Sequence, residues 1–224
     1  MKRGVRSYVL RQGRITPAQQ RALDRLYPQY GIAFSDSFLS SKSIFGRQAP
    51  LVLEIGSGMG ETTAAIAAAH PETDFIAVEV HGPGVGSLLN RIAAAELKNL
   101  RVIRHDATEV LQRMIPEGAL AAIHLFFPDP WPKKRHHKRR LVEPSFVSLA
   151  AEKLSSGAIV HLATDWPDYA EQIAEVFSKN DLFERSEGGF VERPATKFET
   201  RGKRLGHPIR DLCFRRRGTA PAAR

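Results

Sequence analysis

Apolar and polar positions form blocks along the chain that predict strands and helices in turn. Five apolar runs of strand length are each followed by an amphipathic or alanine-rich stretch of helical length. The predicted strands are 50–56, 74–80, 100–106, 119–127 and 157–164. The predicted helices are 62–70, 84–97, 107–115, 143–154 and 167–180. This alternation with short connections is typical of a parallel sheet covered by helices on both faces.

The two ends of the chain depart from this alternation. Two weaker strands, 182–186 and 211–217, complete a Rossmann-like, doubly wound α/β sheet of seven mostly parallel strands. Near the other end, Thr16 and Pro17 predict the start of a helix over 16–26. We therefore expect three parts. They are a basic segment over 1–45 that packs on or flanks the core, a domain over 46–217, and a disordered tail over 218–224.

Composition narrows the class of protein. A chain of 224 residues is long enough for one domain with its own core. Cys213 is its only cysteine, which excludes an intrachain disulfide and a cysteine-rich zinc site and favours a reducing compartment. The chain shows no signal-peptide core and no apolar run near the roughly 20 residues of a membrane span. We expect a cytoplasmic monomer or homodimer that binds neither a membrane nor a metal. The net charge of +9 favours a polyanionic binding partner.

Acidic side chains lie at or near the ends of all five predicted strands. They are Glu54, Glu79, Asp106, Asp129 and Asp165. Ligands of such sheets bind outside the carboxyl ends of the strands, so five acids in succession predict a binding rim. An acid is also favoured at a helix N-terminus by the helix dipole, and Asp165 could be only such a cap.

A glycine-rich turn, "EIGSGMGE", joins the first strand to the first helix of the alternation. Gly56, Gly58 and Gly60 allow close approach of a ligand to the backbone. A dinucleotide-binding turn would carry its third glycine at position 61, where this chain has Glu61. An anion at that helix N-terminus opposes a pyrophosphate, so the turn favours a ligand without phosphates.

Three acids of the rim match the parts of S-adenosylmethionine. Glu54 suits a cationic amino group, and Glu79 suits a grip on two ribose hydroxyls. Asp106 could accept a hydrogen bond from the exocyclic amine of adenine. S-Adenosylmethionine is therefore the expected cofactor.

The stretch "FFPDPWPKKRHHKRR" over 126–140 follows the fourth strand. Pro128 and Pro130 stiffen the turn around Asp129, which we expect beside the methyl group of the cofactor. Trp131 could be a core residue, a lid or a contact to a base. The basic run after it could meet RNA phosphates or could be an ordinary solvated face.

Several motifs together resemble the bacterial tRNA (guanine-N7-)-methyltransferases, the TrmB family. The motifs are "RSYVLRQGRITPAQ", "EIGSGMG", "AVEVHGPGVGSLL", "FFPDPWPKKRHHKRR", "LATDW" and "RPATKFETRGKRLGH". The resemblance spans roughly Arg6 to Phe214, and the last strand, with "IRDLCFRRR", departs from it. It implies a class I S-adenosylmethionine-dependent methyltransferase fold and methylation of a guanine in the variable loop of tRNA.

The resemblance also implies roles for individual residues. Glu54, Glu79, Asp106 and Asp129 would bind the cofactor, and Asp129 would also be catalytic. The substrate-binding residues would be Lys133, Asp165, Thr196, Lys197, Phe198 and Glu199. The RNA-contacting residues would be Arg135, His136, His137, Lys138, Arg139 and Arg140.

Two other functions stay open at this point. One is an adenine amino-group methyltransferase, whose fourth strand ends in an Asn/Asp-Pro-Pro-aromatic turn. Here Trp131 and Pro132 stand in the opposite order. The other is a noncatalytic RNA-binding protein that kept the fold, although the retained glycine turn and Asp129 argue against it.

Overall fold

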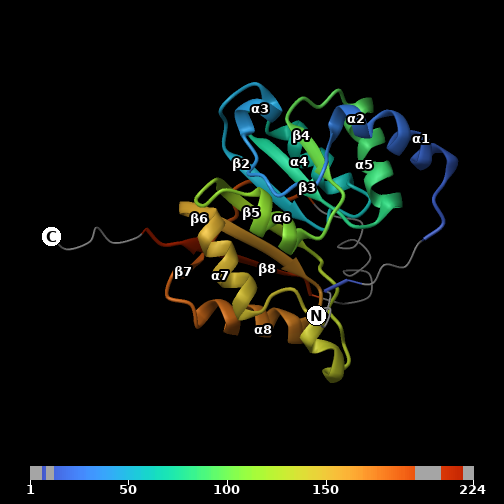
Figure 1. The fold of residues 1–224 in the computed structure, drawn as a ribbon. Coiled ribbons are helices and arrows are strands. Elements are labelled where there is room, and N and C mark those ends of the chain that lie inside the picture. The colour runs from blue at the N-terminus through green and yellow to red at the C-terminus, as the bar shows by residue number, and fades with distance from the viewer. Residues whose placement is uncertain (1–6, 9–12, 195–207, 219–224) are drawn as a thin grey trace.

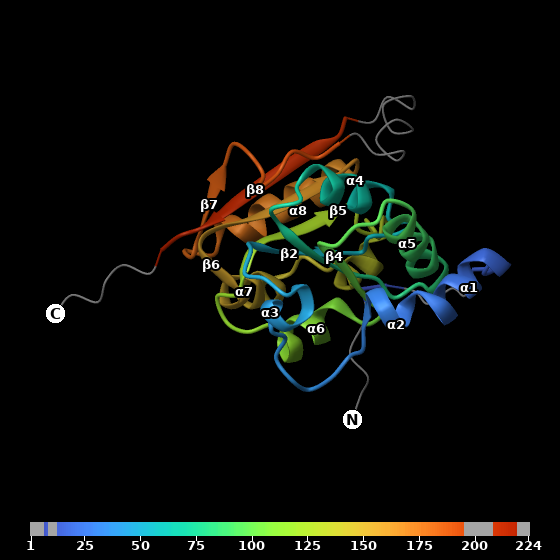
Figure 2. The ribbon, with the colours of Figure 1, turned by 90° about the horizontal axis from the view of Figure 1, so that it is seen from above.

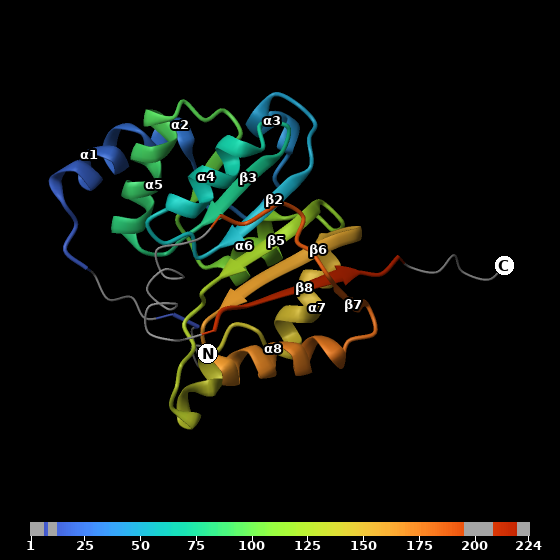
Figure 3. The ribbon, with the colours of Figure 1, turned by 180° about the vertical axis from the view of Figure 1, so that it is seen from behind.

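A single eight-stranded sheet forms the centre of the computed structural model, which describes residues 7–8, 13–194 and 208–218 (Figure 1). The strand order is β1-β4-β3-β2-β5-β6-β8-β7. The strands are β1 Gly31–Ile32, β2 Leu51–Ile55, β3 Asp74–Val78, β4 Leu100–Ile103, β5 Leu120–Phe126, β6 Leu154–Thr164, β7 Phe183–Ser186 and β8 Arg210–Arg216. Only β8 runs antiparallel to its neighbours, β6 and β7 (Figure 3).

Helices cover both faces of this sheet. They are α1 Pro17–Arg25, α2 Tyr27–Tyr30, α3 Ser41–Phe45, α4 Glu61–Ala69, α5 Gly82–Ala94, α6 Ala107–Met114, α7 Pro144–Lys153 and α8 Pro167–Ser178. One apolar cluster joins the sheet to α6, α7 and α8, and a second joins it to α1, α4 and α5. Figure 2 shows the sheet between α4 and α5 on one side and α6 and α7 on the other. The predicted three-layer α/β class is confirmed.

The seven predicted strands are all present, and one short strand adds to them. β1 comes from the N-terminal segment and pairs in parallel with β4, with Gly31 opposite Val102 and Ile32 opposite Ile103. Two residues are too few to show any periodicity, so the sequence pattern gave no sign of this strand. The boundary at residue 46 between a flanking segment and a domain stays a prediction.

The apolar composition of the parallel strands explains why they are buried. All five residues of β2 and all five of β3 are buried, as expected for strands that helices cover on both faces. The first helix also begins where its sequence predicts, because the side chains and backbones of Thr16 and Gln19 form a reciprocal capping box. Among the helices of the described residues, none combines the length and apolar character needed to cross a membrane.

Close packing of α5 fixes the glycine turn beside it. A Cβ atom on Gly84 would lie 2.4 Å from the backbone oxygen of Gly58. Only glycine allows this helix to lie so near the turn. The turn is thereby held at the carboxyl ends of β2 and β3.

Candidate functional site

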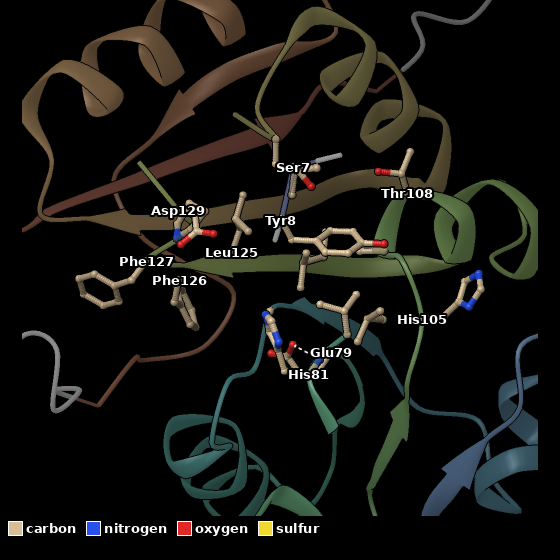
Figure 4. Close-up of a pocket in the computed structure, with 17 residues that line it drawn as sticks. Ser7, Tyr8, Glu79, His81, His105, Thr108, Leu125, Phe126, Phe127 and Asp129 are labelled. Atoms are coloured by element: carbon tan, nitrogen blue, oxygen red, sulfur yellow. Dashed lines mark hydrogen bonds between the residues drawn. The ribbon is translucent and has the colours of Figure 1, made fainter. Parts of the chain in front are cut away.

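A cavity of about 210 Å³ lies at the carboxyl ends of the central strands (Figure 4). Its walls come from the ends of β2, β3 and β5, the start of α6 and two N-terminal residues. The polar side chains that line it are Ser7, Tyr8, Glu79, His81, His105, Thr108 and Asp129. Two of the predicted acids therefore meet at one cavity, as the topology of the sheet requires.

The glycine turn borders this cavity and needs its glycines. Gly56, Gly58 and Gly60 have φ angles of 75°, 55° and 75°, a left-handed conformation that side chains disfavour. A Cβ atom on Gly56 or Gly58 would meet nothing within 4 Å, so the space beside the turn is open. The backbone here can approach a ligand.

Glu79 ties the glycine turn to the end of β3. Its Oε2 accepts a hydrogen bond of 2.8 Å from the backbone N–H of Gly58. Its Oε1 accepts one of 2.8 Å from the backbone N–H of His81. Each carboxylate oxygen can accept a further hydrogen bond, so the predicted contact to ribose hydroxyls fits this arrangement.

Glu54 lies behind the turn as a buried acid with an unused oxygen. Its Oε1 accepts a hydrogen bond of 2.8 Å from the Thr63 hydroxyl, whereas Oε2 has no partner. Burial raises its pKa to about 7, although the Thr63 hydrogen bond opposes the shift and the charge of Glu79 adds to it. An unpaired buried carboxylate oxygen is unfavourable, and a cationic group nearby would stabilise it.

Asp106 has the structural role at a helix start that the sequence offered as the alternative for such acids. Its Oδ1 accepts hydrogen bonds from the backbone N–H groups of Thr108, at 2.8 Å, and Glu109, at 3.2 Å. It thereby caps α6. Asp106 borders a neighbouring cavity of about 430 Å³ and not the first one. Its contact to the cofactor stays a prediction.

The turn that carries Asp129 is strained as well as stiff. Phe127 and Trp131 have φ angles of 53° and 45° and flank the Pro-Asp-Pro sequence. A left-handed conformation at a residue other than glycine typically costs about 1–3 kcal/mol and is common at functional sites. Asp129 is exposed and lines the cavity. The surrounding contacts therefore hold an unfavourable backbone that presents this carboxylate to the cavity.

Trp131 connects this turn to the N-terminal segment. Its Nε1–H donates a hydrogen bond of 3.1 Å to the backbone oxygen of Ser7. The guanidinium carbon of Arg139 lies 5.0 Å from the centre of its ring. These contacts show that Trp131 holds neighbouring segments together, and the roles left open by the sequence stay predictions.

The basic run forms the short 3-10 helix η1, Lys134–Arg139, and its residues differ in exposure. Arg135 and Lys138 are exposed, as an RNA-contacting role requires. The side chain of Arg140, in contrast, is only 1% exposed. It donates hydrogen bonds to the backbone oxygen of Pro130, at 2.9 Å, and to Gln172, at 2.6 Å, and it also pairs with Asp168. The guanidinium of Arg140 is thus held by partners within the protein, and its contact to RNA stays a prediction.

The remaining predicted substrate residues lie in two places. Lys133 is exposed and caps the start of η1. Asp165 follows β6 but is not the cap of α8, because Trp166 occupies that position, so the capping explanation fails. Outside the described residues lie Thr196, Lys197, Phe198 and Glu199.

Five polar residues that line the cavity were missing from the predicted site. Three are His81, His105 and Thr108, and two come from the N-terminal segment. These two are Ser7 and Tyr8, and Figure 4 shows the ring of Tyr8 between Asp129 at one end and His105 at the other. Ser7 and Tyr8 belong to the motif "RSYVLRQGRITPAQ", which is part of the family resemblance. Nothing in that motif indicates a particular chemical role, so the two residues were not predicted as part of the site. In the described parts of the chain, no group of three His, Cys, Asp or Glu residues is arranged to hold a metal ion.

Solved structures with a similar fold are methyltransferases. The 16S rRNA methyltransferase KamB superposes with a TM-score of 0.56 at 15% identity, over 81% of this chain and 95% of that one. An rRNA methylase from Streptococcus thermophilus superposes with a TM-score of 0.53 at 12% identity, over 92% and 100%. At these identities the likeness concerns the fold alone.

Comparison of sequences gives a much closer relationship. Residues 48–212 match the model of a family described as putative methyltransferases. The tRNA (guanine-N(7)-)-methyltransferase of Aromatoleum aromaticum is 56% identical over 96% of this chain and 85% of its own length. The protein of the same name from Nitrosomonas europaea is 55% identical over 95% and 96%. This chain belongs to the tRNA (guanine-N(7)-)-methyltransferase family.

Proposed function

We propose that the protein transfers the methyl group of S-adenosylmethionine to N7 of a guanine in the variable loop of tRNA, in the cytoplasm. The observation that carries this proposal is the strained Asp129 turn, which presents a carboxylate to the cavity in a chain of this family. The glycine turn at the same cavity disfavours a ligand with phosphates, because Glu61 follows it. Incubation of the purified protein with unmodified tRNA and methyl-labelled S-adenosylmethionine tests it. We expect label in the tRNA, and a protein that transfers none would contradict the proposal.

Glu79 at the cavity and Glu54, buried behind the glycine turn, fit S-adenosylmethionine. The free Oε2 of Glu54 suits its amino group, and the carboxylate of Glu79 suits its ribose hydroxyls. We also assign Gly56, Gly58 and Gly60 to the backbone that lies against it. When bound, the cofactor supplies a methyl group that is activated by attachment to a positively charged sulfur.

Asp129 acts, in this proposal, by position and charge. Guanine N7 has an in-plane lone pair and no hydrogen, so its methylation requires no proton removal and no general base. The carboxylate can hold the cationic end of the donor, accept hydrogen bonds from the guanine edge, or do both. Either role benefits from an acceptor whose direction is fixed before the reaction, and the strained turn supplies that.

The RNA is bound by groups around the mouth of the cavity. We assign phosphate contacts to Arg135, His136, His137, Lys138 and Arg139 on η1. Flexible cations give affinity and position without reading bases, so recognition of the guanine falls to other groups. We assign the other contacts to the substrate to Lys133, Asp165, Thr196, Lys197, Phe198 and Glu199.

Neither other function has a supporting observation. An adenine amino-group methyltransferase would need the proline and aromatic residue after Pro130 in the reverse order. A noncatalytic RNA-binding protein would have no need to maintain the backbone strain at Phe127 and Trp131.

Removal of two exposed charges from η1 is expected to flatten the salt dependence of tRNA binding. In the variant Arg135→Ala/Lys138→Ala, two phosphate contacts are lost. At about 0.7–0.9 per contact, the slope of log affinity against log salt should become shallower by roughly 1.5. Binding titrations at several salt concentrations measure this slope, and the affinity for S-adenosylmethionine should not change.

A matched control removes the same charge elsewhere. Lys42 and Lys98 are exposed and lie near the amino end of β4, at the edge of the sheet opposite the cavity. The variant Lys42→Ala/Lys98→Ala should keep the slope of the parent protein. If both double variants show the same slope of log affinity against log salt, the η1 cations do not contact RNA phosphates and form an ordinary solvated surface.

Ionisation of Glu54 is expected to control cofactor affinity near neutral pH. Its pKa of about 7 means that the free protein loses this negative charge as the pH falls below 7. Because the ionised form attracts the amino group, affinity should drop by up to about tenfold per unit between pH 7 and 5.5. Calorimetry across this range should show the drop in the parent, whereas Glu54→Gln should bind weakly and with little pH dependence. An equal pH dependence in both proteins would exclude Glu54.

A further inference from the structure

A clamp of three charged or polar side chains lies outside the groups assigned above. Arg193 donates from Nε to Asp211 Oδ1 at 3.0 Å and from Nη2 to Asp211 Oδ2 at 2.9 Å. His161 Nε2 lies 2.8 Å from the same Oδ1. The side chain of Arg193 is only 6% exposed. A two-pronged pair of this kind fixes both the distance and the orientation of its partners.

The clamp joins the loop after β7 to strands β6 and β8. Asp211 lies on β8 opposite Ala163 of β6, and His161 lies on β6 two residues earlier. Arg193 belongs to the segment that follows β7 and leads directly to residues 196–199. The clamp therefore attaches the loop that follows β7 to β6 and β8.

Arg193 also contacts the turn that carries Asp129. Its guanidinium carbon lies 5.6 Å from the ring centres of both Phe126 and Phe127. Phe127 is one of the two strained residues of that turn. Its backbone N–H donates a hydrogen bond of 2.7 Å to Ala163, the residue opposite Asp211. The guanidinium of Arg193 thus contacts the strained turn directly. Through Asp211 it is also linked to the place on the sheet, at Ala163, where the backbone of that turn is hydrogen-bonded.

The charges of this clamp reinforce one another. Partial burial alone would raise the pKa of Asp211, but hydrogen bonds from His161 and Arg193 outweigh it and hold the pKa well below its usual range. Only a planar guanidinium can pair with both carboxylate oxygens and lie over aromatic rings at once, so lysine is no equivalent here.

We propose that Arg193 is a positioning residue that holds the Asp129 turn in place against β6 and β8. The role rests on the function proposed above and adds a residue that touches neither the donor nor the reacting atoms. Its loss should slow methyl transfer without weakening cofactor binding, because the cofactor residues on β2 and β3 do not contact it.

The test compares single-turnover rates at saturating tRNA and S-adenosylmethionine. We expect a loss of about a hundredfold for Arg193→Met, since small misplacements of reacting groups have effects of this size. Arg193→Lys keeps the charge and should lose about tenfold. Cofactor affinity, measured by calorimetry, should equal that of the parent in both variants.

A double variant and a matched control separate positioning from general stability. Arg193→Lys/Asp211→Asn should be no slower than the slower single variant, because both changes break the same clamp. Arg47 also pairs with an aspartate, because its Nε, at 3.0 Å, and its Nη2, at 2.7 Å, both donate to Oδ1 of Asp74 at the amino end of β3. Arg47→Lys should leave the transfer rate unchanged.

Three results would overturn this role. They are parental rates in both Arg193 variants, additive losses in the double variant, or a loss of cofactor affinity that parallels a lower unfolding temperature. If the parent protein itself transfers no methyl group to tRNA, the proposed function fails and this role fails with it. An active parent with active Arg193 variants would overturn the positioning role alone.

Discussion

Replacement of Asp129 by alanine is expected to lower the single-turnover rate of methyl transfer by on the order of 10²–10³-fold. Loss of one preorganised polar group at a reacting centre typically has an effect of this size. Asp129→Asn keeps one acceptor oxygen and should retain more activity than the alanine variant. Both variants should fold, because Pro128 and Pro130 still restrict the turn and the exposed carboxylate is not part of the core.

The pH dependence of the same rate separates charge stabilisation from base catalysis. Since guanine N7 carries no proton, the rate at saturating substrates should be nearly flat between about pH 6.5 and 8.5. A rate that rises tenfold per pH unit, and that Asn and Ala variants of Asp129 abolish equally, would indicate a required base. That result would contradict the mechanism proposed for Asp129.

Loss of the Glu79 carboxylate is expected to weaken cofactor binding by about 1.5–3 kcal/mol, or roughly 10–150-fold, in the variant Glu79→Ala. The ribose contact is one reason. The structure adds another, because the same carboxylate holds the backbone N–H groups of Gly58 and His81 and so fixes the glycine turn. Calorimetry with S-adenosylmethionine measures the change, and tRNA binding without cofactor should be nearly unaffected.

Two further variants serve as comparisons for Glu79→Ala. Glu79→Gln keeps a carbonyl oxygen that can accept one of the two backbone hydrogen bonds, so its loss should be intermediate. Glu72→Ala removes an exposed acid before β3, away from the cavity, and should bind the cofactor as the parent does. If Glu79→Ala binds as tightly as Glu72→Ala, the carboxylate has no part in the site.

The strands and the rim could be predicted because they depend on local patterns. Long apolar runs identify buried strands, and the parallel topology then places residues such as Glu79 and Asp129 at one edge. The short strand β1 escaped prediction because two residues form no pattern, and its pairing with β4 depends on contacts about seventy positions apart.

Side-chain direction could not be predicted for the basic run. Arg135 and Arg140 belong to the same charged stretch, yet one is exposed and the other is buried against Asp168 and Tyr169. The turn of η1 and the position of α8 decide this difference, and neither is visible in composition. The contact of Trp131 with Ser7 joins residues 124 positions apart and was equally beyond a reading of local sequence.

The central claim is most directly tested by locating the methyl group on the product. Unmodified tRNA is incubated with the protein and labelled S-adenosylmethionine, digested, and analysed for modified nucleosides. A second sample is reduced and treated with aniline, which cleaves the chain at N7-methylguanine because of its fixed ring charge. We predict labelled N7-methylguanosine and cleavage at one guanine of the variable loop, both lost in Asp129→Ala. Label in another nucleoside, or labelled tRNA that resists cleavage there, would contradict the account.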